Sequence, residues 1–312
     1  MGIVIFSGGA NQPLAQTVAN QLGLPLGQRI LSRFPDSELH VEILQSVRGH
    51  DVFLIQPTSP PADEHLMELL FLADACYRAG ARRTIAIVPY FGYARQDRRG
   101  KGREPVGARI TSDLFAAAHI DRAVALDLHT PELEGFMSIP LEHLTAVPLL
   151  VEAVRPLIEA DSVVVAPDLG GAKLAERYAR ALDRPLAVVH KARISGHEVE
   201  VRGIVGEVAG RAPIIVDDMV STAGTIAAAV SALMDAGARP PAVVVATHGL
   251  MVGEAVDRLK GLPIQRLIFS DSVAAVAKPE LPIQIASTAP LLAEAIKRLH
   301  AEQSLAGLIL HQ

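Results

Sequence analysis

Residues 74–90 read DACYRAGARRTIAIVPY, and residues 231–248 read SALMDAGARPPAVVVATH. Both stretches contain the end of a helical pattern, then Ala-Gly-Ala-Arg, then an apolar run typical of a strand. Glycine after a helix is common, so this stop signal alone could arise by chance. Because the flanking helix and strand match as well, an internal duplication is the better interpretation.

Short apolar runs alternate with helical patterns along the whole chain. Half of the 312 residues are apolar but only 4% are aromatic, as expected for buried parallel strands flanked by helices. The alternation predicts an α/β fold of the doubly wound type. Strands are expected at 3–6, 52–56, 84–88, 123–126, 162–166, 186–189, 213–216, 242–246 and 266–269, and the clearest helices at 62–78, 174–182 and 226–236.

The chain length favours two domains, and the duplication divides it into residues 1–146 and 147–312. The halves differ in one loop. The second half has Asp217-Asp218 followed by Ser-Thr-Ala-Gly-Thr, whereas the first has Gln56-Pro-Thr-Ser-Pro-Pro61, with no acid and three prolines. We therefore expect the second half to retain a binding loop that the first half has lost.

Charge and composition exclude several classes of protein. The net charge of −5 argues against a nucleic-acid partner, because phosphate backbones are bound by basic surfaces. The single cysteine, Cys76, excludes intrachain disulfides and cysteine-rich metal sites, and its apolar helical surroundings predict a buried thiol. Apolar runs of about eight residues are too short to span a membrane, and no signal peptide is evident. The expected location is cytoplasmic, without a membrane partner.

Residues 214–225, IIVDDMVSTAGT, predict a strand, two acids, a small polar loop and the start of a helix. Such a loop lies at the carboxyl edge of a parallel sheet, where open α/β folds bind ligands. Its amides and hydroxyls suit a phosphate, and the two acids suit vicinal hydroxyls of a sugar. The alternative is an ordinary Asp/Ser-rich turn in which Thr225 caps the helix. The residues concerned are Asp217, Asp218, Ser221, Thr222, Ala223, Gly224 and Thr225.

A basic stretch, PYFGYARQDRRGKGREP, occupies residues 89–105. Arginine forks suit phosphate oxygens and can stack on a purine ring. Since the stretch follows an expected strand, it also belongs to the ligand edge and favours a polyphosphate site. The alternative is a solvated basic loop.

Three further polar groups follow expected strands. LDLHT at 126–130 offers an acid and His129 for a divalent cation, a weak signal because Mg²⁺ prefers oxygen ligands. Asp168 precedes a Gly-Gly pair in PDLGG at 167–171. In HKARISGHEVE at 190–200, Lys191 and Arg193 occupy alternate positions of an extended segment, so both cations can face one anion. An exposed hairpin is an equally good interpretation of that segment.

Taken together, these stretches resemble the ribose-phosphate diphosphokinase family over nearly the whole chain. The matching segments are RFPDSELHVEI (33–43), SVRGHDVFLIQ (46–56), DEHLMELL (63–70), PYFGYARQDR (89–98), REP (103–105), DLHT (127–130), PDLGG (167–171) and VDDMVSTAGT (216–225). The resemblance implies two duplicated phosphoribosyltransferase-like domains, each a mainly parallel sheet flanked by helices. It also implies transfer of the diphosphoryl group of Mg-ATP to the 1-hydroxyl of ribose 5-phosphate, with AMP as the second product.

The resemblance assigns a role to each group of residues. Phe34, Asp36 and Glu38, with Ser37 in the same stretch, would bind adenine across a subunit interface, and Arg95 and Gln96 would bind ATP. His129 and Asp168 would hold Mg²⁺. Lys191 and Arg193 would be catalytic, and ribose 5-phosphate would be bound by Arg193, Asp217, Asp218, Ser221, Thr222, Ala223, Gly224 and Thr225. The shared adenine pocket implies a homo-oligomer of at least a dimer, and hexamers are common among relatives.

Two other functions compete with this reading. A non-catalytic regulatory homologue would bind active subunits, but the retained Lys191, Arg193, Arg95, Gln96 and His129 argue against it. A phosphoribosyltransferase would share only the 214–225 loop. The chain departs from the usual family pattern at Ser37, Leu169 and Ser221, where Gly, His and Asp are common. Ser221 removes a negative charge and adds a donor beside the phosphate, so we expect binding to survive.

Overall fold

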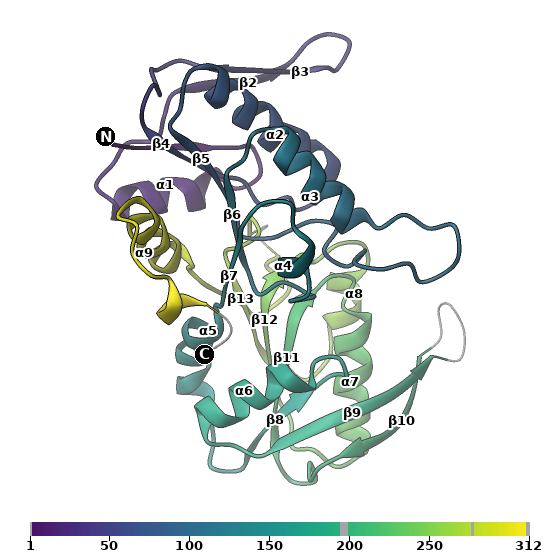
Figure 1. Ribbon diagram of the computed structural model, residues 1–312. Helices are drawn as coiled ribbons and strands as arrows, with labels where there is room; N and C mark the ends of the chain where they lie inside the picture. Colours follow the sequence, from purple (N-terminus) through teal and green to yellow (C-terminus); the bar gives the residue numbers. More distant parts are fainter. Residues whose placement is uncertain (1, 194–198, 276–277, 310–312) are drawn as a thin grey trace. The chain divides into compact units, whose positions relative to one another are not determined.

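The computed structural model describes residues 2–193, 199–275 and 278–309, with the backbone alone at 191–193 and 199–202 (Figure 1). The chain forms two compact units. The first unit contains Met1–Thr145, Ser272–Ala274 and Ser287–Gln312, and the second contains Ala146–Asp271 and Ala275–Ala286.

The first unit is built on a five-stranded parallel sheet in the order β1-β4-β5-β6-β7. Its strands are short runs of β-branched and small apolar residues, buried on both faces as parallel strands require. Their bounds are β1 Ile3–Ser7, β4 Asp51–Ile55, β5 Arg83–Val88, β6 Arg122–Leu126 and β7 Leu141–Leu144.

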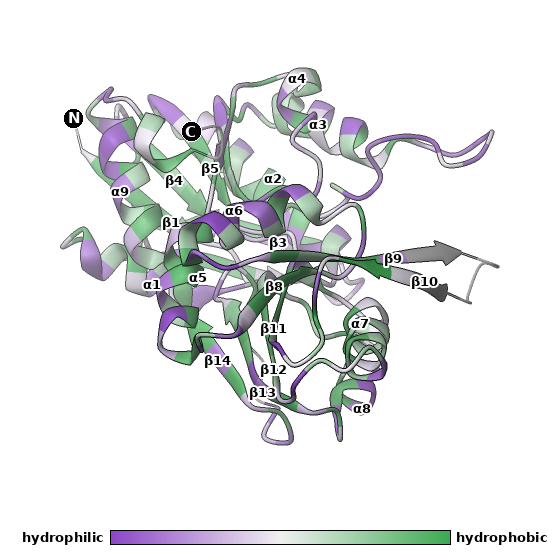
Figure 2. Ribbon diagram, turned by 90° about the horizontal axis from the view of Figure 1, so that it is seen from below, coloured by the Kyte–Doolittle hydropathy of each residue, from purple (hydrophilic) through white to green (hydrophobic). Residues whose placement is uncertain are grey.

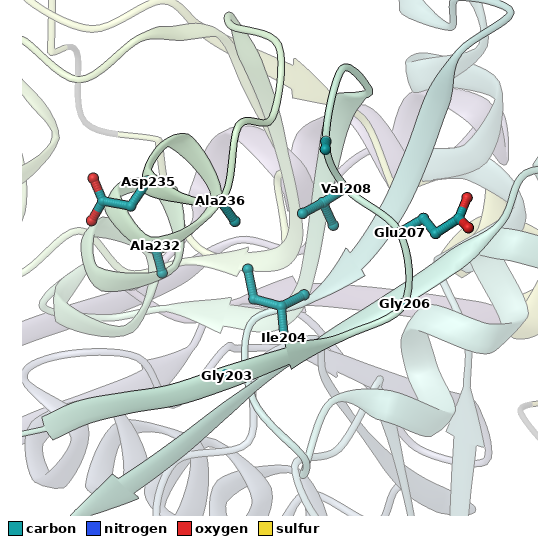
Figure 3. A pocket seen from close by; sticks show the side chains of 9 residues that line it. Gly203, Ile204, Gly206, Glu207, Val208, Ala232, Asp235 and Ala236 are labelled. Atoms are coloured by element: carbon teal, nitrogen blue, oxygen red, sulfur yellow. The ribbon is translucent and has the colours of Figure 1, made fainter.

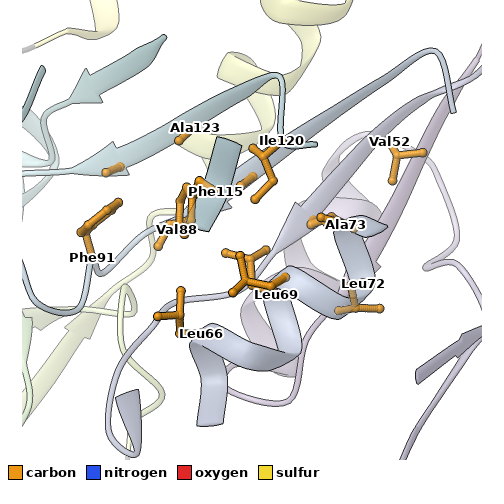
Figure 4. Packing of buried hydrophobic residues seen from close by; sticks show 14 of the residues in the cluster. Val52, Leu66, Leu69, Leu72, Ala73, Val88, Phe91, Phe115, Ile120 and Ala123 are labelled. Atoms are coloured by element: carbon orange, nitrogen blue, oxygen red, sulfur yellow. The ribbon is translucent and has the colours of Figure 1, made fainter. Parts of the chain in front are cut away.

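Helices cover both faces of this sheet. Alternate strand residues such as Val52 and Val88 pack against Leu69 and Phe115 on one face (Figure 4). The intervening residues, including Phe53, face the other side. The first face is covered by α2 Ala62–Arg78, α3 Gly107–Ala117 and α4 Leu133–Phe136, and the second by α1 Gln12–Gln21 and α9 Ala289–His300.

The second unit contains a seven-stranded sheet in the order β10-β9-β8-β11-β12-β13-β14, parallel except for the antiparallel pair β9–β10. Figure 2 shows β8 and β11 largely in the colour of hydrophobic residues. The strands are β8 Ser162–Ala166, β9 Leu186–Arg193, β10 Val199–Val205, β11 Ala212–Val220, β12 Ala242–Gly249, β13 Ile264–Ser270 and β14 Ile283–Ala286. Helices α7 Gly224–Asp235 and α8 Ala255–Leu259 cover one face, and α5 Val147–Val154 and α6 Ala172–Leu182 cover the other.

The two units repeat one topology, which confirms the predicted duplication. In each, the first strand leads through a helix to an antiparallel hairpin, and then to four further parallel strands in the same spatial order. The first hairpin consists of β2 Arg29–Arg33 and β3 Leu39–Ile43, which form a separate two-stranded sheet. The second hairpin, β9–β10, extends the sheet of its own unit because β9 pairs with β8. Two short 3₁₀ turns, Arg155–Leu157 and Ala306–Leu308, complete the described elements.

The end of the chain departs from the expected division into residues 1–146 and 147–312. Helix α9 belongs to the first unit, because its apolar face, including Leu292 and Ile296, packs with Leu14 and Val18 of α1. At its C-terminus, His300 makes a 2.8 Å contact with the buried carboxylate of Asp51. Sequence-adjacent halves are therefore only an approximation to the packed units.

Two further expectations concern the burial of Cys76 and the presence of membrane-spanning helices. Cys76 is fully buried, as predicted, and burial raises the pKa of its thiol to about 12. Among the described helices, none combines the length and the apolar character that crossing a bilayer requires.

Candidate functional site

The 221–225 loop lies at the carboxyl end of β11 and continues directly into α7. Ala223, its third residue, adopts a left-handed conformation with φ 60° and ψ 5°. This conformation costs a residue with a Cβ about 1–2 kcal/mol, so surrounding contacts must hold it in place.

Those contacts are hydrogen bonds to four successive carbonyls. The amides of Met251 and Val252 donate to the carbonyls of Val220 and Ser221, each at 3.0 Å. Arg258 Nη1 donates to the Thr222 carbonyl at 3.0 Å. The Ala223 carbonyl accepts from the Ala227 amide at 2.9 Å in the first turn of α7.

The carbonyls of residues 220–223 accept hydrogen bonds, but several amides of the loop are not used as donors. The backbone N–H groups of residues 221–224 donate no hydrogen bond to any part of the chain that the structure describes. They precede or begin α7, and unsatisfied amides at a helix N-terminus favour an anion. The loop therefore offers the backbone donors that the predicted phosphate site requires.

Three carboxylates accompany this loop. The Asp218 amide donates to Asp217 Oδ1 at 2.9 Å, and Asp168, after β8, accepts from the Gly171 amide at 3.2 Å. Burial, followed by the negative charges of Asp218 and Asp168, raises the pKa of Asp217 well above its usual range. Excess negative charge of this kind favours hydroxyl donors or a divalent cation bound by oxygen. The oxygen donors of the second unit thus suit Mg²⁺.

The predicted metal pair is divided between the units. Asp168 belongs to the second unit and His129 to the first, where its side chain is exposed. Within the described residues, no three His, Cys, Asp or Glu side chains converge on one point.

In the first unit, the stretch after β5 carries Arg95 and Gln96, both exposed. A turn at the left-handed Tyr93 positions them, since the Gln96 amide donates to the Tyr93 carbonyl at 2.8 Å. Thr130 Oγ1 donates to Asp97 Oδ2 at 3.1 Å and so connects this stretch to the 126–130 loop. The structure therefore brings the predicted ATP-binding segment beside the segment that carries His129.

The hairpin β2–β3 presents the predicted adenine-binding residues in the turn between its strands. Phe34 is 49% exposed, although it is a large apolar side chain. The Phe34 amide donates to Glu38 at 2.9 Å, and the Glu38 amide donates to Asp36 Oδ1 at 3.1 Å. Ser37 is left-handed with φ 75°, which explains in physical terms why glycine suits this position.

The 56–61 loop, which follows β4, is the counterpart of the 221–225 loop and is closed by its own chain. The Thr58 amide donates to the Tyr90 carbonyl at 2.9 Å, and Thr58 Oγ1 accepts from the Gly92 amide at 2.6 Å. Gln56 accepts from the Ala10 amide at 3.0 Å and donates to Glu68 at 2.6 Å. This loop supports the 89–96 stretch instead of offering amides to a ligand.

Lys191 and Arg193 are the last alternate residues of β9, opposite Val201 and Val199 of β10. The antiparallel pairing bears out the hairpin that the sequence left open. The side chains of both cations, and residues 194–198 between the strands, lie outside the described part of the chain.

A hollow in the second unit lies away from these loops. It is bordered by β10, the segment after it and the C-terminal end of α7, including Ile204, Val208 and Ala236 (Figure 3). The 221–225 loop meets the opposite end of that 12-residue helix, about 18 Å along its axis. The hollow is therefore separate from the candidate phosphate site.

Three residues that support the loops were missed by the sequence analysis. Besides Arg258 and Thr58, they include His143 of β7, which is buried and accepts from the Leu128 amide at 2.8 Å. Each contact joins segments at least 15 residues apart. A single sequence contains no local signal for such pairs.

Comparisons of the chain with family models and with known proteins agree on one family. A family model described as the N-terminal domain of ribose phosphate pyrophosphokinase matches residues 3–118, and one described as the phosphoribosyl synthetase-associated domain matches residues 193–310. A ribose-phosphate pyrophosphokinase of Gloeobacter violaceus is 41% identical over 306 residues, covering 97% of this chain and 92% of the relative. That of Staphylococcus saprophyticus is 43% identical over 309 residues, covering 97% and 96%.

A solved structure gives the same result for the fold. The crystal structure of phosphoribosylpyrophosphate synthetase from Mycobacterium smegmatis matches with a TM-score of 0.90 and 36% identity, covering 97% of this chain and 100% of that one. Both the predicted resemblance and the predicted fold class are thereby confirmed. The chain belongs to the ribose-phosphate pyrophosphokinase family.

Proposed function

We propose that this protein is a ribose-phosphate diphosphokinase, which transfers the diphosphoryl group of Mg-ATP to ribose 5-phosphate. The products are 5-phosphoribosyl 1-diphosphate and AMP. The observation that carries the assignment is the 221–225 loop, in which the amides of residues 221–224 have no partner in the described chain and follow two acids at the carboxyl end of β11. Similarity to ribose-phosphate pyrophosphokinases over 97% of the chain distinguishes this function from that of a phosphoribosyltransferase, which would share only the loop.

Ribose 5-phosphate occupies this end of the second unit in the proposal. The amides of residues 221–225 and the hydroxyls of Ser221, Thr222 and Thr225 bind the 5-phosphate. Asp217 and Asp218 accept hydrogen bonds from the ribose hydroxyls. The raised pKa of Asp217 supports this role, because hydroxyl donors relieve the repulsion that burial and neighbouring carboxylates create.

ATP binds to loops of the first unit in the proposal. Arg95 and Gln96 contact the nucleotide, and the guanidinium of Arg95 stacks on the purine or pairs with phosphate oxygens. Phe34, Asp36, Ser37 and Glu38 bind the adenine of a neighbouring subunit. The 49% exposure of Phe34 supports this shared pocket, since an exposed aromatic side chain suits an interface. The protein would then be at least a dimer, which a mass measurement by light scattering tests.

Mg²⁺ accompanies ATP, with His129 and Asp168 as its protein ligands in the proposal. When bound, it supplies positive charge to the phosphate oxygens. Asp168 suits this role because it is an oxygen ligand whose negative charge is close enough to raise the pKa of Asp217.

The reaction is an in-line displacement. The 1-oxygen of ribose 5-phosphate forms a bond to the β-phosphorus of ATP while the bond from that phosphorus to the α,β-bridging oxygen breaks. AMP leaves with the bridging oxygen, and the proton of the 1-hydroxyl is released. Lys191 and Arg193 stabilise the charge that develops on the transferred oxygens, most effectively when the β9–β10 hairpin excludes water from the site.

The test is AMP release from ATP and Mg²⁺, measured with and without ribose 5-phosphate. We expect AMP to form in proportion to the phosphoribosyl diphosphate produced, and only when the sugar phosphate is present. A protein that binds both substrates without sugar-dependent AMP would instead be the non-catalytic homologue.

A further inference from the structure

Arg258 connects α8 to the 221–225 loop. Its Nη1 donates to the Thr222 carbonyl at 3.0 Å, and its Nη2 pairs with Glu254 one turn earlier at 2.8 Å. The Arg258 side chain is 40% exposed, so it reaches the loop from the surface. One terminal nitrogen of the guanidinium is thus paired with Glu254, and the other is hydrogen-bonded to the loop.

The Thr222 carbonyl is held differently from its neighbours. Backbone amides hold the carbonyls of Val220, Ser221 and Ala223, whereas a side chain holds that of Thr222. The peptide between Thr222 and Ala223 contains this carbonyl and also the amide of the left-handed Ala223. If the carbonyl is released, this peptide can rotate, because rotation relieves the unfavourable conformation of Ala223. The same rotation turns the Ala223 amide away from a bound phosphate.

The guanidinium also lies next to the first residue of α7. A Cβ placed on Gly224 would be 3.3 Å from Arg258 Nη1 and 4.0 Å from Thr222 Oγ1. The positive charge of Arg258 is therefore near the end of α7 at which the amides of residues 221–224 lie.

We propose that Arg258 is a positioning residue for the ribose 5-phosphate site. It fixes the Thr222–Ala223 peptide so that the loop amides point to the phosphate of the sugar. This inference rests on the proposed function, because it concerns the site assigned there to the 5-phosphate.

The test compares Arg258→Met, Arg258→Lys and a matched control, Arg180→Met, in the full-length protein. Arg180 makes the same kind of helical pair, with Glu176 at 2.5 Å, but it lies on α6 and does not hold the 221–225 loop. Steady-state kinetics with Mg-ATP give KM and kcat, and calorimetry measures binding of ribose 5-phosphate directly. Arg258→Lys keeps one donor and the charge, so it serves as the conservative rescue.

Arg258→Met is expected to raise the KM and the Kd for ribose 5-phosphate by roughly tenfold or more, which corresponds to losing one charge-assisted hydrogen bond. Its kcat and its KM for ATP should stay within about threefold of the unmodified protein, and Arg258→Lys should recover most of the loss. Arg180→Met should change none of these values. The inference is overturned if the affinity of Arg258→Met for the sugar phosphate is unchanged, or if both KM values shift together.

The readouts separate this inference from the function on which it rests. If the unmodified protein binds ribose 5-phosphate but releases no AMP, the proposed function fails, while weaker binding by Arg258→Met still supports the positioning role. If the protein is active and Arg258→Met binds normally, the positioning role fails and the function stands. If the unmodified protein neither binds the sugar phosphate nor releases AMP, both fail.

Discussion

The 56–61 loop and the 221–225 loop occupy equivalent places, each after the first strand that follows the hairpin of its unit. In the first, Gln56, Thr58 and Ser59 are buried, and Gln56 and Thr58 are hydrogen-bonded to neighbouring segments. In the second, protein donors hold the carbonyls and leave the amides of residues 221–224 free within the described chain. The same topology thus produces a structural brace in one unit and a candidate anion site in the other.

The residue types explain this difference. Pro57, Pro60 and Pro61 carry no backbone N–H, so half of the backbone donors that the first loop could offer to an anion are absent. The second loop contains small residues and hydroxyls, with no proline. Function here depends on which backbone donors remain available, and not on the fold alone.

The largest effect is expected from a substitution in the β9–β10 hairpin, whose counterpart in the first unit is the β2–β3 hairpin. Lys191→Ala should reduce kcat by about 1000-fold, because a cation that stabilises only developing charge contributes to the transition state. The Kd for ribose 5-phosphate should change little. Stopped-flow AMP release and calorimetry measure the two quantities, with the exposed Lys260→Ala in the same unit as the control. An unchanged rate would show that the hairpin has no catalytic part.

The second-largest effect is expected when an acid of the second unit is replaced by its uncharged amide. The first half has Gln56 where the second half has its acids, so this substitution makes the two units alike in charge at that position. Asp217→Asn should lower kcat/KM for ribose 5-phosphate by roughly 10- to 100-fold, through loss of charged hydrogen bonds. The ligand-free protein should nevertheless gain about 1 kcal/mol in free energy of unfolding at neutral pH.

The pH dependence of that gain follows from the raised pKa of Asp217. The folded state holds the proton more tightly than the unfolded chain does. The free energy of unfolding therefore falls as the pH rises through the unfolded value of about 4 toward the higher folded value. Denaturant unfolding of both proteins should show their stabilities converging below about pH 4 and diverging above it. A constant difference at every pH would contradict this account.

A smaller effect is expected when the brace in the first unit is broken. Thr58→Val keeps the shape but removes the hydroxyl that accepts from the Gly92 amide, so the stretch that carries Arg95 and Gln96 should loosen. The KM for ATP should rise by about tenfold while the KM for ribose 5-phosphate stays the same. Thr58→Ser keeps the hydroxyl and should restore the affinity. Equal changes in both KM values would mean that the loop has no specific link to ATP.

The smallest effect concerns the strained residue of the second loop. Ala223→Gly should raise the free energy of unfolding by up to about 1 kcal/mol, because glycine adopts a positive φ without the Cβ penalty. The KM for ribose 5-phosphate should remain within about threefold, since the other loop contacts persist. Thermal unfolding and steady-state kinetics measure the two quantities. A loss of stability would show that the left-handed conformation carries no strain.

The sequence predicted the parallel strands well, because their buried apolar runs are a strong local signal. It missed β2, β3, β7 and β14, and it left β10 open as one arm of a hairpin. Segments such as Leu39–Ile43 mix polar and apolar residues, and in so few residues the strand period is hard to distinguish from loop composition. The 221–225 loop was also identified from its composition. The role of the Thr222 carbonyl was not predicted, because it depends on a hydrogen bond from Arg258, which is 36 residues away in the sequence.

The place of α9 in the first unit has a consequence for biosynthesis. The chain emerges from the ribosome N-terminus first, so all strands of the first sheet are made long before residues 289–300. Until then, side chains such as Ile5, Phe53 and Val124 lack α9, the helix that covers them in the finished protein. The unit that is translated first is thus completed last, and the second unit has time to fold in between. Fragments ending before residue 289 should therefore be prone to aggregation, and premature termination near the end of translation should be as damaging as termination in the middle.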